Sequence, residues 1–211
     1  MKLPMTMPQC EPLQPGKFYH IYNHGVGNRN LFMDADNYSY FIDLYDKYIS
    51  PIADTLAWVL MPNHFHFLVR INMSSPNLTG FENLSGLNTT NFDIKPPHQY
   101  FSNLFNAYTK AVNKRYDSRG SLFERPFKRK LIDSDEYLKQ VILYIHDNPV
   151  HHGFCHNPVE YPWSSYLTCI SIKPNNLNRD HVIGLFHNQA NFKTMHHING
   201  EIETIEQWLE L

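Results

Sequence analysis

The sequence contains few of the features that mark secreted, membrane-spanning or strongly charged proteins. Its three cysteines, Cys10, Cys155 and Cys169, are too few and too far apart for a disulfide framework or a Cys-x-x-Cys zinc site. No apolar run approaches the roughly 18 residues of a membrane span, and the N-terminal residues lack the apolar core of a secretion signal. We therefore expect a cytoplasmic protein in a reducing compartment, with no membrane partner.

The net charge of −2 is also low, so the chain as a whole gives no sign of a nucleic-acid partner. The charge is unevenly distributed, because eight of the 18 basic residues lie between residues 110 and 130, with two acidic residues among them. These basic residues are Lys110, Lys114, Arg115, Arg119, Arg125, Lys128, Arg129 and Lys130. Tyr108, Tyr116, Phe123 and Phe127 are interleaved with them. Such a composition is typical of a groove for single-stranded nucleic acid, and it is also found on solvated helix faces.

The apolar pattern predicts an ordered series of strands and helices. The predicted strands are 18–23, 54–60, 64–71 and 127–132, and the predicted helices are 36–50, 100–116 and 135–147. We expect Asp36 to cap the first helix, and Pro149 to end the third because proline lacks a backbone N–H. Residues 72–98 are rich in Asn, Ser, Thr and Gly and predict a long loop, and short helices are expected near 180–187 and 200–210.

This order of elements predicts a ferredoxin-like α+β fold, in which helices pack on one face of an antiparallel sheet. With 211 residues, 42% of them hydrophobic, the chain is long enough for one domain with a substantial core. We expect an extended arm at residues 1–17, a main domain at 18–170 with residues 72–98 as a flexible insert, and a helical extension at 171–211.

Two histidines one residue apart, His64 and His66, occur in the third predicted strand. Because side chains alternate along a strand, both imidazoles point to one face, and Phe65 and Phe67 point to the other. This geometry suits a metal ion. Taken alone, however, two histidines on a half-buried strand are more often ordinary core or surface residues than metal ligands.

The third predicted helix offers side chains that complement this pair. Tyr144 and Asn148 are four residues apart, so they share one face if the helix keeps its register to Pro149. Two imidazoles and an amide oxygen would hold a divalent ion with open positions. A phenol beside such an ion would attack a phosphodiester. The alternative is that Tyr144 is a packed aromatic residue of an amphipathic helix.

Several segments resemble one known family in both sequence and order. Pro62-Asn63-His64-Phe65-His66 resembles the HUH motif of single-tyrosine transposases, and residues 136–153 resemble their nucleophile helix and its exit. Residues 120–128 and 161–166 are similar to segments of the subgroup associated with repetitive extragenic palindromes. The resemblance covers about residues 18–168.

This resemblance implies a metal-dependent enzyme that nicks and rejoins single-stranded hairpin DNA through a 5′-phosphotyrosine. It implies that His64, His66 and Asn148 bind Mg²⁺ or Mn²⁺ and that Tyr144 is the nucleophile. The candidate DNA surface is the basic segment 110–130. A homodimer is compatible with the family, and the alternative function is a domesticated protein that binds DNA hairpins with little or no cleavage.

Other residues stay open as candidates. Tyr108 is a rival nucleophile, because it lies on a predicted helix near two lysines, but no amide follows four residues later. His146, His151 and His152 are candidates for metal or phosphate contact, and His20 and His24 are expected in the core or on the surface. A zinc-stabilised structural domain is a further alternative, for which the cysteine-rich partners typical of such sites are missing.

Overall fold

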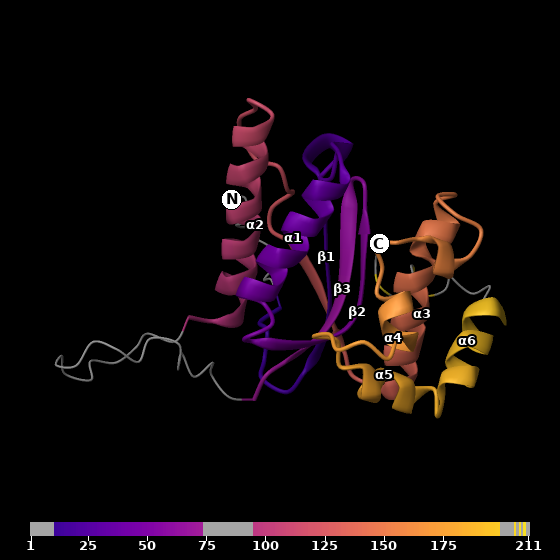
Figure 1. Cartoon of the computed structure of the whole chain (residues 1–211). Helices are drawn as coiled ribbons and strands as arrows, with labels where there is room; N and C mark the ends of the chain where they lie inside the picture. The colour runs from indigo at the N-terminus through magenta and orange to yellow at the C-terminus, as the bar shows by residue number, and fades with distance from the viewer. Residues whose placement is uncertain (1–10, 74–94, 199–204, 206, 208, 210–211) are drawn as a thin grey trace, which may run out of the picture.

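The chain is organised around a four-stranded antiparallel sheet with the strand order β2-β3-β1-β4 (Figure 1). A computed structural model describes residues 11–73 and 95–198, together with residues 205, 207 and 209. The strands are β1 Phe18–His24, β2 Ala53–Met61, β3 His64–Ile71 and β4 Lys128–Ile132. This strand order, with α1 after β1 and α2 after β3, confirms the predicted ferredoxin-like α+β fold.

Helices cover both faces of the sheet, so the prediction of helices on one face holds only for the first two (Figure 1). Helices α1 (Ala35–Tyr48) and α2 (Pro97–Arg115) pack side by side on one face. Helix α3 (Asp135–His151) packs on the other face, against β2 and β3. The remaining helices lie around α3 and are α4 Tyr166–Ile170, α5 Arg179–Leu185 and α6 Gln189–Ile198. The additional layer arises because α3 is apolar on more than one side and is buried among these elements.

The sheet separates two hydrophobic cores. Phe65 and Phe67 of β3 pack with Phe41 and Tyr45 of α1 on the first face. On the second face, Leu68 of β3 belongs to the core that includes α3. Each fully buried large apolar side chain stabilises the fold by about 1.5–3 kcal/mol relative to an exposed one. Both cores therefore fix the position of β3, the strand that carries the paired histidines.

Helix α1 begins earlier than the sequence predicted. Its N-cap is Asp34, whose side chain accepts a hydrogen bond from the backbone N–H of Asn37 at 3.0 Å. The predicted cap, Asp36, instead lies in the first turn, where its negative charge interacts favourably with the positive end of the helix dipole. The prediction for Asp36 is wrong because Asp34 is the residue with the extended backbone that a capping position requires.

Helix α3 continues past Pro149, contrary to the prediction that this proline ends it. Proline removes one helical hydrogen bond, but the backbone bonds on either side close the last turn. The N–H of His152 donates to the carbonyl of Asn148 at 3.0 Å, and the N–H of Phe154 donates to the carbonyl of Pro149 at 2.8 Å. The chain leaves the helix at Gly153, whose φ of 73° suits glycine. Asn148 is therefore held in helical register with Tyr144.

The outer edge of β2 is covered by residues 163–165. The N–H of Leu60 donates to the carbonyl of Trp163, and the N–H of Ser165 donates to the carbonyl of Trp58, both at 2.9 Å. The hydroxyl of Tyr161 donates to the carbonyl of Leu60 at 2.8 Å. This segment was predicted only as a turn-rich region, and it satisfies backbone groups that an open edge would leave unpaired.

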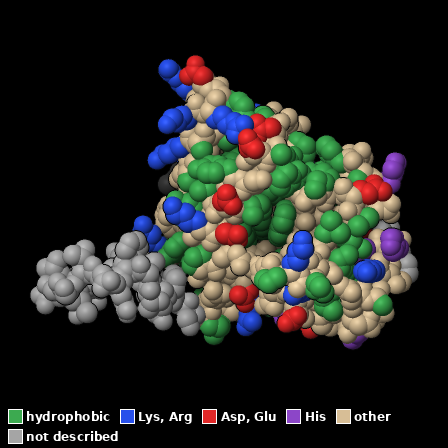
Figure 2. Space-filling view, in the orientation of Figure 1, with side chains coloured by type: hydrophobic (Ala, Val, Ile, Leu, Met, Phe, Trp, Pro, Cys, Tyr) green, Lys and Arg blue, Asp and Glu red, His purple; other side chains and the backbone are tan. Residues whose placement is uncertain are grey.

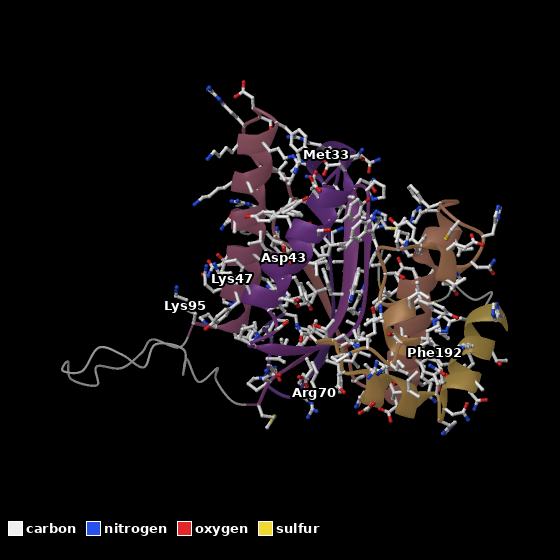
Figure 3. All side chains as sticks on the ribbon, viewed as in Figure 1. Met33, Asp43, Lys47, Arg70, Lys95 and Phe192 are labelled. Carbon is white, nitrogen blue, oxygen red and sulfur yellow. The ribbon has the colours of Figure 1, made fainter. Side chains whose placement is uncertain are left out.

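A chain of buried hydrogen bonds connects α6 to α3 and β2. His196 Nδ1 donates to the Phe192 carbonyl at 2.7 Å, so its Nε2 accepts from His146 Nδ1 at 2.9 Å. His146 Nε2 then accepts from Ser165 Oγ, which in turn accepts from the N–H of Trp58, both at 2.8 Å. Phe192 is fully buried in the same layer (Figure 3). In this series each imidazole donates through Nδ1 and accepts through Nε2. Both imidazoles are therefore neutral, and all the hydrogen bonds run in the same direction.

This network predicts a loss of stability in acid. Burial lowers the pKa of His196 to about 4 in the folded protein. In the unfolded chain this histidine is protonated once the pH falls below about 6.5, so acid favours the unfolded chain. We expect this one residue to lower the free energy of unfolding by roughly 2 kcal/mol between about pH 7.5 and about pH 5. Urea denaturation at the two pH values measures the change.

The matched control for this prediction is His196→Gln, whose side chain does not titrate. Its stability is expected to depend less on pH than that of the wild type. Asp147 acts in the opposite direction, because burial raises its pKa to about 7 and its protonated form stabilises the fold at low pH. Since Asp147 is present in both proteins, its contribution cancels in the difference between them. Equal pH dependence in the two proteins would contradict the prediction.

Some sequence predictions fall outside the described residues. Most of the predicted loop 72–98 and most of the predicted helix near 200–210 lie there. Helix α5 matches the helix expected near 180–187, and α6 was not predicted. The division into an arm at 1–17, a domain at 18–170 and an extension at 171–211 stays a prediction. Within the described part of the chain, none of the helices has the length and apolarity of a membrane span.

Candidate functional site

The histidines of β3 lie on the sheet face that α3 covers. Strand β1 is the neighbour of β3, and its register places His24 opposite His64 and Tyr22 opposite His66. The rings of His24 and His64 are stacked with centroids 4.9 Å apart. The alternation predicted from the sequence is confirmed, because the phenylalanines of β3 pack on the other face.

A tight turn after β1 orients His64. The Gly25 N–H donates to the Asn63 carbonyl at 2.8 Å, and a Cβ at Gly25 would lie 1.9 Å from the Arg29 carbonyl oxygen, so only glycine fits. The turn carries Asn28, whose Oδ1 accepts from Asn63 Nδ2 at 2.6 Å. The other side of that amide, Asn63 Oδ1, lies 2.8 Å from His64 Nδ1. This contact holds His64 with its Nδ1 proton toward Asn63.

Helix α3 brings Tyr144 and Asn148 to the same histidines. Asn148 Oδ1 lies 3.1 Å from His64 Nε2. The Tyr144 ring meets the His66 ring edge-on, with centroids 5.4 Å apart and planes at 86°. Both side chains from α3 are almost fully buried. Residues that are some eighty positions apart in the chain therefore form one cluster.

A pocket of about 500 Å³ opens onto this cluster. It is lined by Tyr22, His24, Asn28, Asn63, His64, His66, Lys128, Tyr144, His152 and Phe154. Lys128 lies on β4 directly across from Tyr22, and its ammonium is 5.7 Å from the centre of that ring. The described residues that line the pocket include this lysine and no carboxylate. The pocket therefore suits an anionic ligand such as a phosphodiester.

The imidazoles of the cluster are neutral at neutral pH. Burial lowers the pKa of His64 to about 4, against the opposing effect of its contact with Asn148. The pKa of His66 lies well below its ordinary value, first because of burial and then because of the neighbouring His20. Burial lowers the pKa of His24 as well. A neutral imidazole has a lone pair to offer to a metal ion, whereas an imidazolium has none.

The atoms around His64 fit a divalent cation. Because Nδ1 carries the proton toward Asn63, the lone pair of Nε2 faces Asn148 Oδ1, which also has only lone pairs. Asn148 Nδ2 is buried without a hydrogen-bond partner. Two neighbouring ligands of an octahedral ion at about 2.1 Å are about 3.0 Å apart, which agrees with the 3.1 Å between these two atoms. The donor set, two imidazoles and an amide oxygen, is compatible with Mg²⁺ or Mn²⁺. Among the described residues, no group of three or more His, Cys, Asp or Glu side chains is placed so that it could hold a metal ion, so the amide is needed to complete the set.

The basic segment 110–130 is divided between the two sides of the sheet. Lys128 and Lys130 lie on the histidine face of β4, opposite Tyr22 and His20 of β1. Figure 2 shows Lys and Arg side chains along the outer side of α2, on the other side of the molecule from α3. The residues nearest the site are therefore the two lysines of β4.

The other basic residues lie farther from the pocket. Arg115 pairs with Asp34 at 2.9 Å and with Asp36 at 3.2 Å, so part of its charge is already balanced. Arg125 and Arg129 line a second pocket, which also includes residues of α2 on the opposite face. Lys110, Lys114 and Arg119 are exposed, as Arg115 is, and line neither pocket. A role in DNA binding stays a prediction for all eight residues.

The structure removes Tyr108 as a rival nucleophile. Its side chain is fully buried on the α1 and α2 face, and its hydroxyl donates to the Leu31 carbonyl at 2.8 Å. Burial raises the pKa of its phenol far above the ordinary value. His146 is likewise occupied by the buried network to α6. His151 is exposed at the end of α3, and His152 lines the pocket.

Several pocket residues were missed or underrated by sequence reasoning. Tyr22 was not singled out, and His24 was expected only in the core or on the surface. Asn28 and Phe154 also line the pocket. The alternation of His20, Tyr22 and His24 was visible in the sequence, but it does not say which strand lies beside β1. A correct pairing of β1 with β3 would have placed all three on the histidine face.

The fold defines the class, a ferredoxin-like α+β protein with a histidine-bearing central strand and an additional helix over it. Among solved structures, the chain matches a REP-associated tyrosine transposase bound to a REP hairpin, with a TM-score of 0.57 and 14% sequence identity. The match covers 82% of this chain and 90% of the transposase chain. No family model and no curated protein matches the chain. The chain therefore shares the fold of a tyrosine transposase, which confirms the resemblance predicted from the sequence at the level of the fold.

Proposed function

We propose that this protein is a metal-dependent DNA strand transferase that nicks and rejoins single-stranded hairpin DNA. The observation that carries the proposal is the meeting of Tyr144 and Asn148 from α3 with His64 and His66 from β3 at one pocket. The shared fold with a transposase that is bound to a hairpin supports the choice of substrate. A buried phenol next to neutral imidazoles and a lysine has a direct use in phosphodiester chemistry.

Tyr144 is the proposed nucleophile. Its phenol oxygen attacks the phosphorus, a Tyr–O–P bond forms, and the bond from phosphorus to the 3′ oxygen breaks. The phenol gives up its proton and the departing 3′ oxygen gains one, so no further reactant is consumed. The products are a 5′-phosphotyrosine and a free 3′-hydroxyl. The reverse reaction with another 3′-hydroxyl rejoins the strand.

His64, His66 and Asn148 would hold the divalent cation, Mg²⁺ or Mn²⁺. When bound, the cation supplies Lewis-acid polarisation of the phosphodiester and stabilises negative charge on the departing oxygen. The protein side chains hold the reacting phosphate in place. Lys128 lies in the same pocket, where its ammonium is available for a phosphate oxygen.

The substrate is proposed to be a single strand next to a hairpin. Tyr144 lines the pocket and is almost fully buried, so a flexible strand reaches it more readily than a stiff duplex. Lys128 and Lys130 would bind the backbone of the strand on the histidine face, and the exposed residues of α2 extend the basic surface. Because this binding depends on charge, we expect it to weaken as salt is raised.

A labelling experiment tests the proposal. Hairpin oligonucleotides with random single-stranded flanks, labelled at either end, are incubated with the protein and Mn²⁺ and run on a denaturing gel. We expect a covalent protein–DNA adduct that carries the 3′-end label, because the tyrosine retains the 5′ phosphate of the downstream fragment. The 5′-end label is expected on a released fragment with a free 3′-hydroxyl. The matched substrate is the same sequence annealed to its complement.

The outcomes separate the competing functions. An adduct that carries the 5′-end label would contradict the proposed polarity. Equal cleavage of the duplex would contradict the single-strand substrate. Binding of the hairpin without any adduct would favour the alternative function, a domesticated hairpin-binding protein.

A further inference from the structure

We propose that His20 is a positioning residue that holds His66 with its Nε2 lone pair free for the divalent ion. The proposal rests on the proposed function, since it concerns the same metal site. His20 comes from β1, and its Nε2 lies 2.9 Å from Nδ1 of His66. The two rings are nearly parallel, with 5° between their planes and 5.1 Å between their centroids. The contact therefore joins the two imidazoles through one ring nitrogen of each.

His20 contacts His66 and does not itself face the pocket. It is fully buried and is not among the residues that line the pocket. Its Nε2 is occupied by His66, and its Nδ1 is buried without any hydrogen-bond partner. A buried imidazole with one unsatisfied nitrogen is unfavourable for folding. Within the described part of the chain, the only hydrogen bond of its side chain is the one to His66.

The hydrogen bond between the two rings has two possible directions. If His66 Nδ1 donates to His20 Nε2, the neutral His66 has a bare Nε2, which is able to bind a metal ion. If His20 Nε2 donates instead, His66 must carry its proton on Nε2, which blocks metal binding. Metal binding therefore requires the first direction, with His20 as the acceptor.

His64 has an equivalent hydrogen-bond partner behind its ring, and that partner is able only to accept. Its Nδ1 faces the amide oxygen of Asn63, and an oxygen of this kind accepts but never donates. The orientation of that amide is fixed by the contact of its Nδ2 with Asn28. Both histidines of the pair thus have an acceptor behind Nδ1, which is the usual arrangement for metal-binding histidines.

Two substitutions distinguish positioning from packing. His20→Phe fills a similar volume without an acceptor, whereas His20→Gln offers an amide oxygen near the position of Nε2. We expect the affinity for Mn²⁺, measured by calorimetry in the absence of DNA, to fall about 10- to 100-fold in His20→Phe. We expect His20→Gln to bind Mn²⁺ nearly as well as the wild type. Urea denaturation of each variant shows whether it is folded.

A direct measurement on the wild type does not depend on any variant. Nitrogen-15 NMR of the histidine rings with Mg²⁺ is expected to show His66 protonated at Nδ1 and bare at Nε2. The proposal is overturned if His66 carries its proton on Nε2 under these conditions, if folded His20→Phe binds Mn²⁺ like the wild type, or if the wild type binds no Mn²⁺. Mn²⁺ binding that is weakened in His20→Phe and kept in His20→Gln, without a DNA adduct in the wild type, would contradict the proposed function and leave the role of His20 supported.

Discussion

Tyr144→Phe is expected to abolish the covalent protein–DNA adduct, with a loss of at least about 10³-fold in the rate of its formation. The substitution removes the one oxygen that forms the bond to phosphorus and leaves the ring in place. Because the Tyr144 side chain is buried and its ring packs edge-on against His66, the variant is expected to fold. The measurement is adduct formation with the 3′-labelled hairpin and Mn²⁺, with circular dichroism as the test of folding.

Two other tyrosines supply the controls. Tyr22 lines the same pocket, so Tyr22→Phe tests whether any phenol in the pocket suffices. Tyr108→Phe removes a buried hydroxyl that donates to a backbone carbonyl, which costs about 1 kcal/mol of stability. Both variants are expected to form the adduct. A persistent adduct in Tyr144→Phe, or its loss in Tyr22→Phe alone, would contradict the assignment of the nucleophile.

His64→Ala is expected to remove binding of Mn²⁺ and, with it, formation of the adduct. The substitution takes away the nitrogen that faces Asn148 Oδ1, so one of three proposed ligands is lost. Loss of a ligand should exceed the roughly 10- to 100-fold effect of losing a supporting residue. We therefore expect the affinity for Mn²⁺ to fall by more than about 100-fold, measured by calorimetry.

His151→Ala is the matched control for this substitution. His151 is exposed at the end of α3, outside the pocket, and its removal should leave both Mn²⁺ binding and the adduct unchanged. Asn148→Ala should have an effect in the same direction as His64→Ala. Wild-type affinity for Mn²⁺ in His64→Ala would exclude a metal site on β3.

The parts of the site that depend on local periodicity could be predicted from the sequence. A strand alternates and a helix repeats every 3.6 residues, so His64 and His66 were assigned to one face. The pairing of Tyr144 with Asn148 followed in the same way. The prediction that Pro149 ends the helix was wrong. It rested on the hydrogen bond that proline cannot donate, whereas the backbone hydrogen bonds around Pro149 still close the last turn.

The parts that depend on contacts between distant segments could not be predicted. Nothing local says that β1 lies beside β3, so Tyr22 and His24 were not assigned to the pocket. The basic segment was treated as one surface, although β4 alternates and divides it between two faces. Helix α6 and its link to α3 through His196 depend on tertiary packing as well.

The alternation of β3 also has an evolutionary consequence. Residues of the proposed site and residues of the first core alternate along this strand. We therefore expect selection for chemistry to act on the first set and selection for folding to act on the second. A lineage that no longer needs DNA cleavage is free to exchange His64 or His66 while Phe65 and Phe67 are still selected for folding. Under the proposed function, loss of catalysis and loss of the fold are then separate events, and we expect exchange of one histidine to remove cleavage while the core residues of β3 still support the fold.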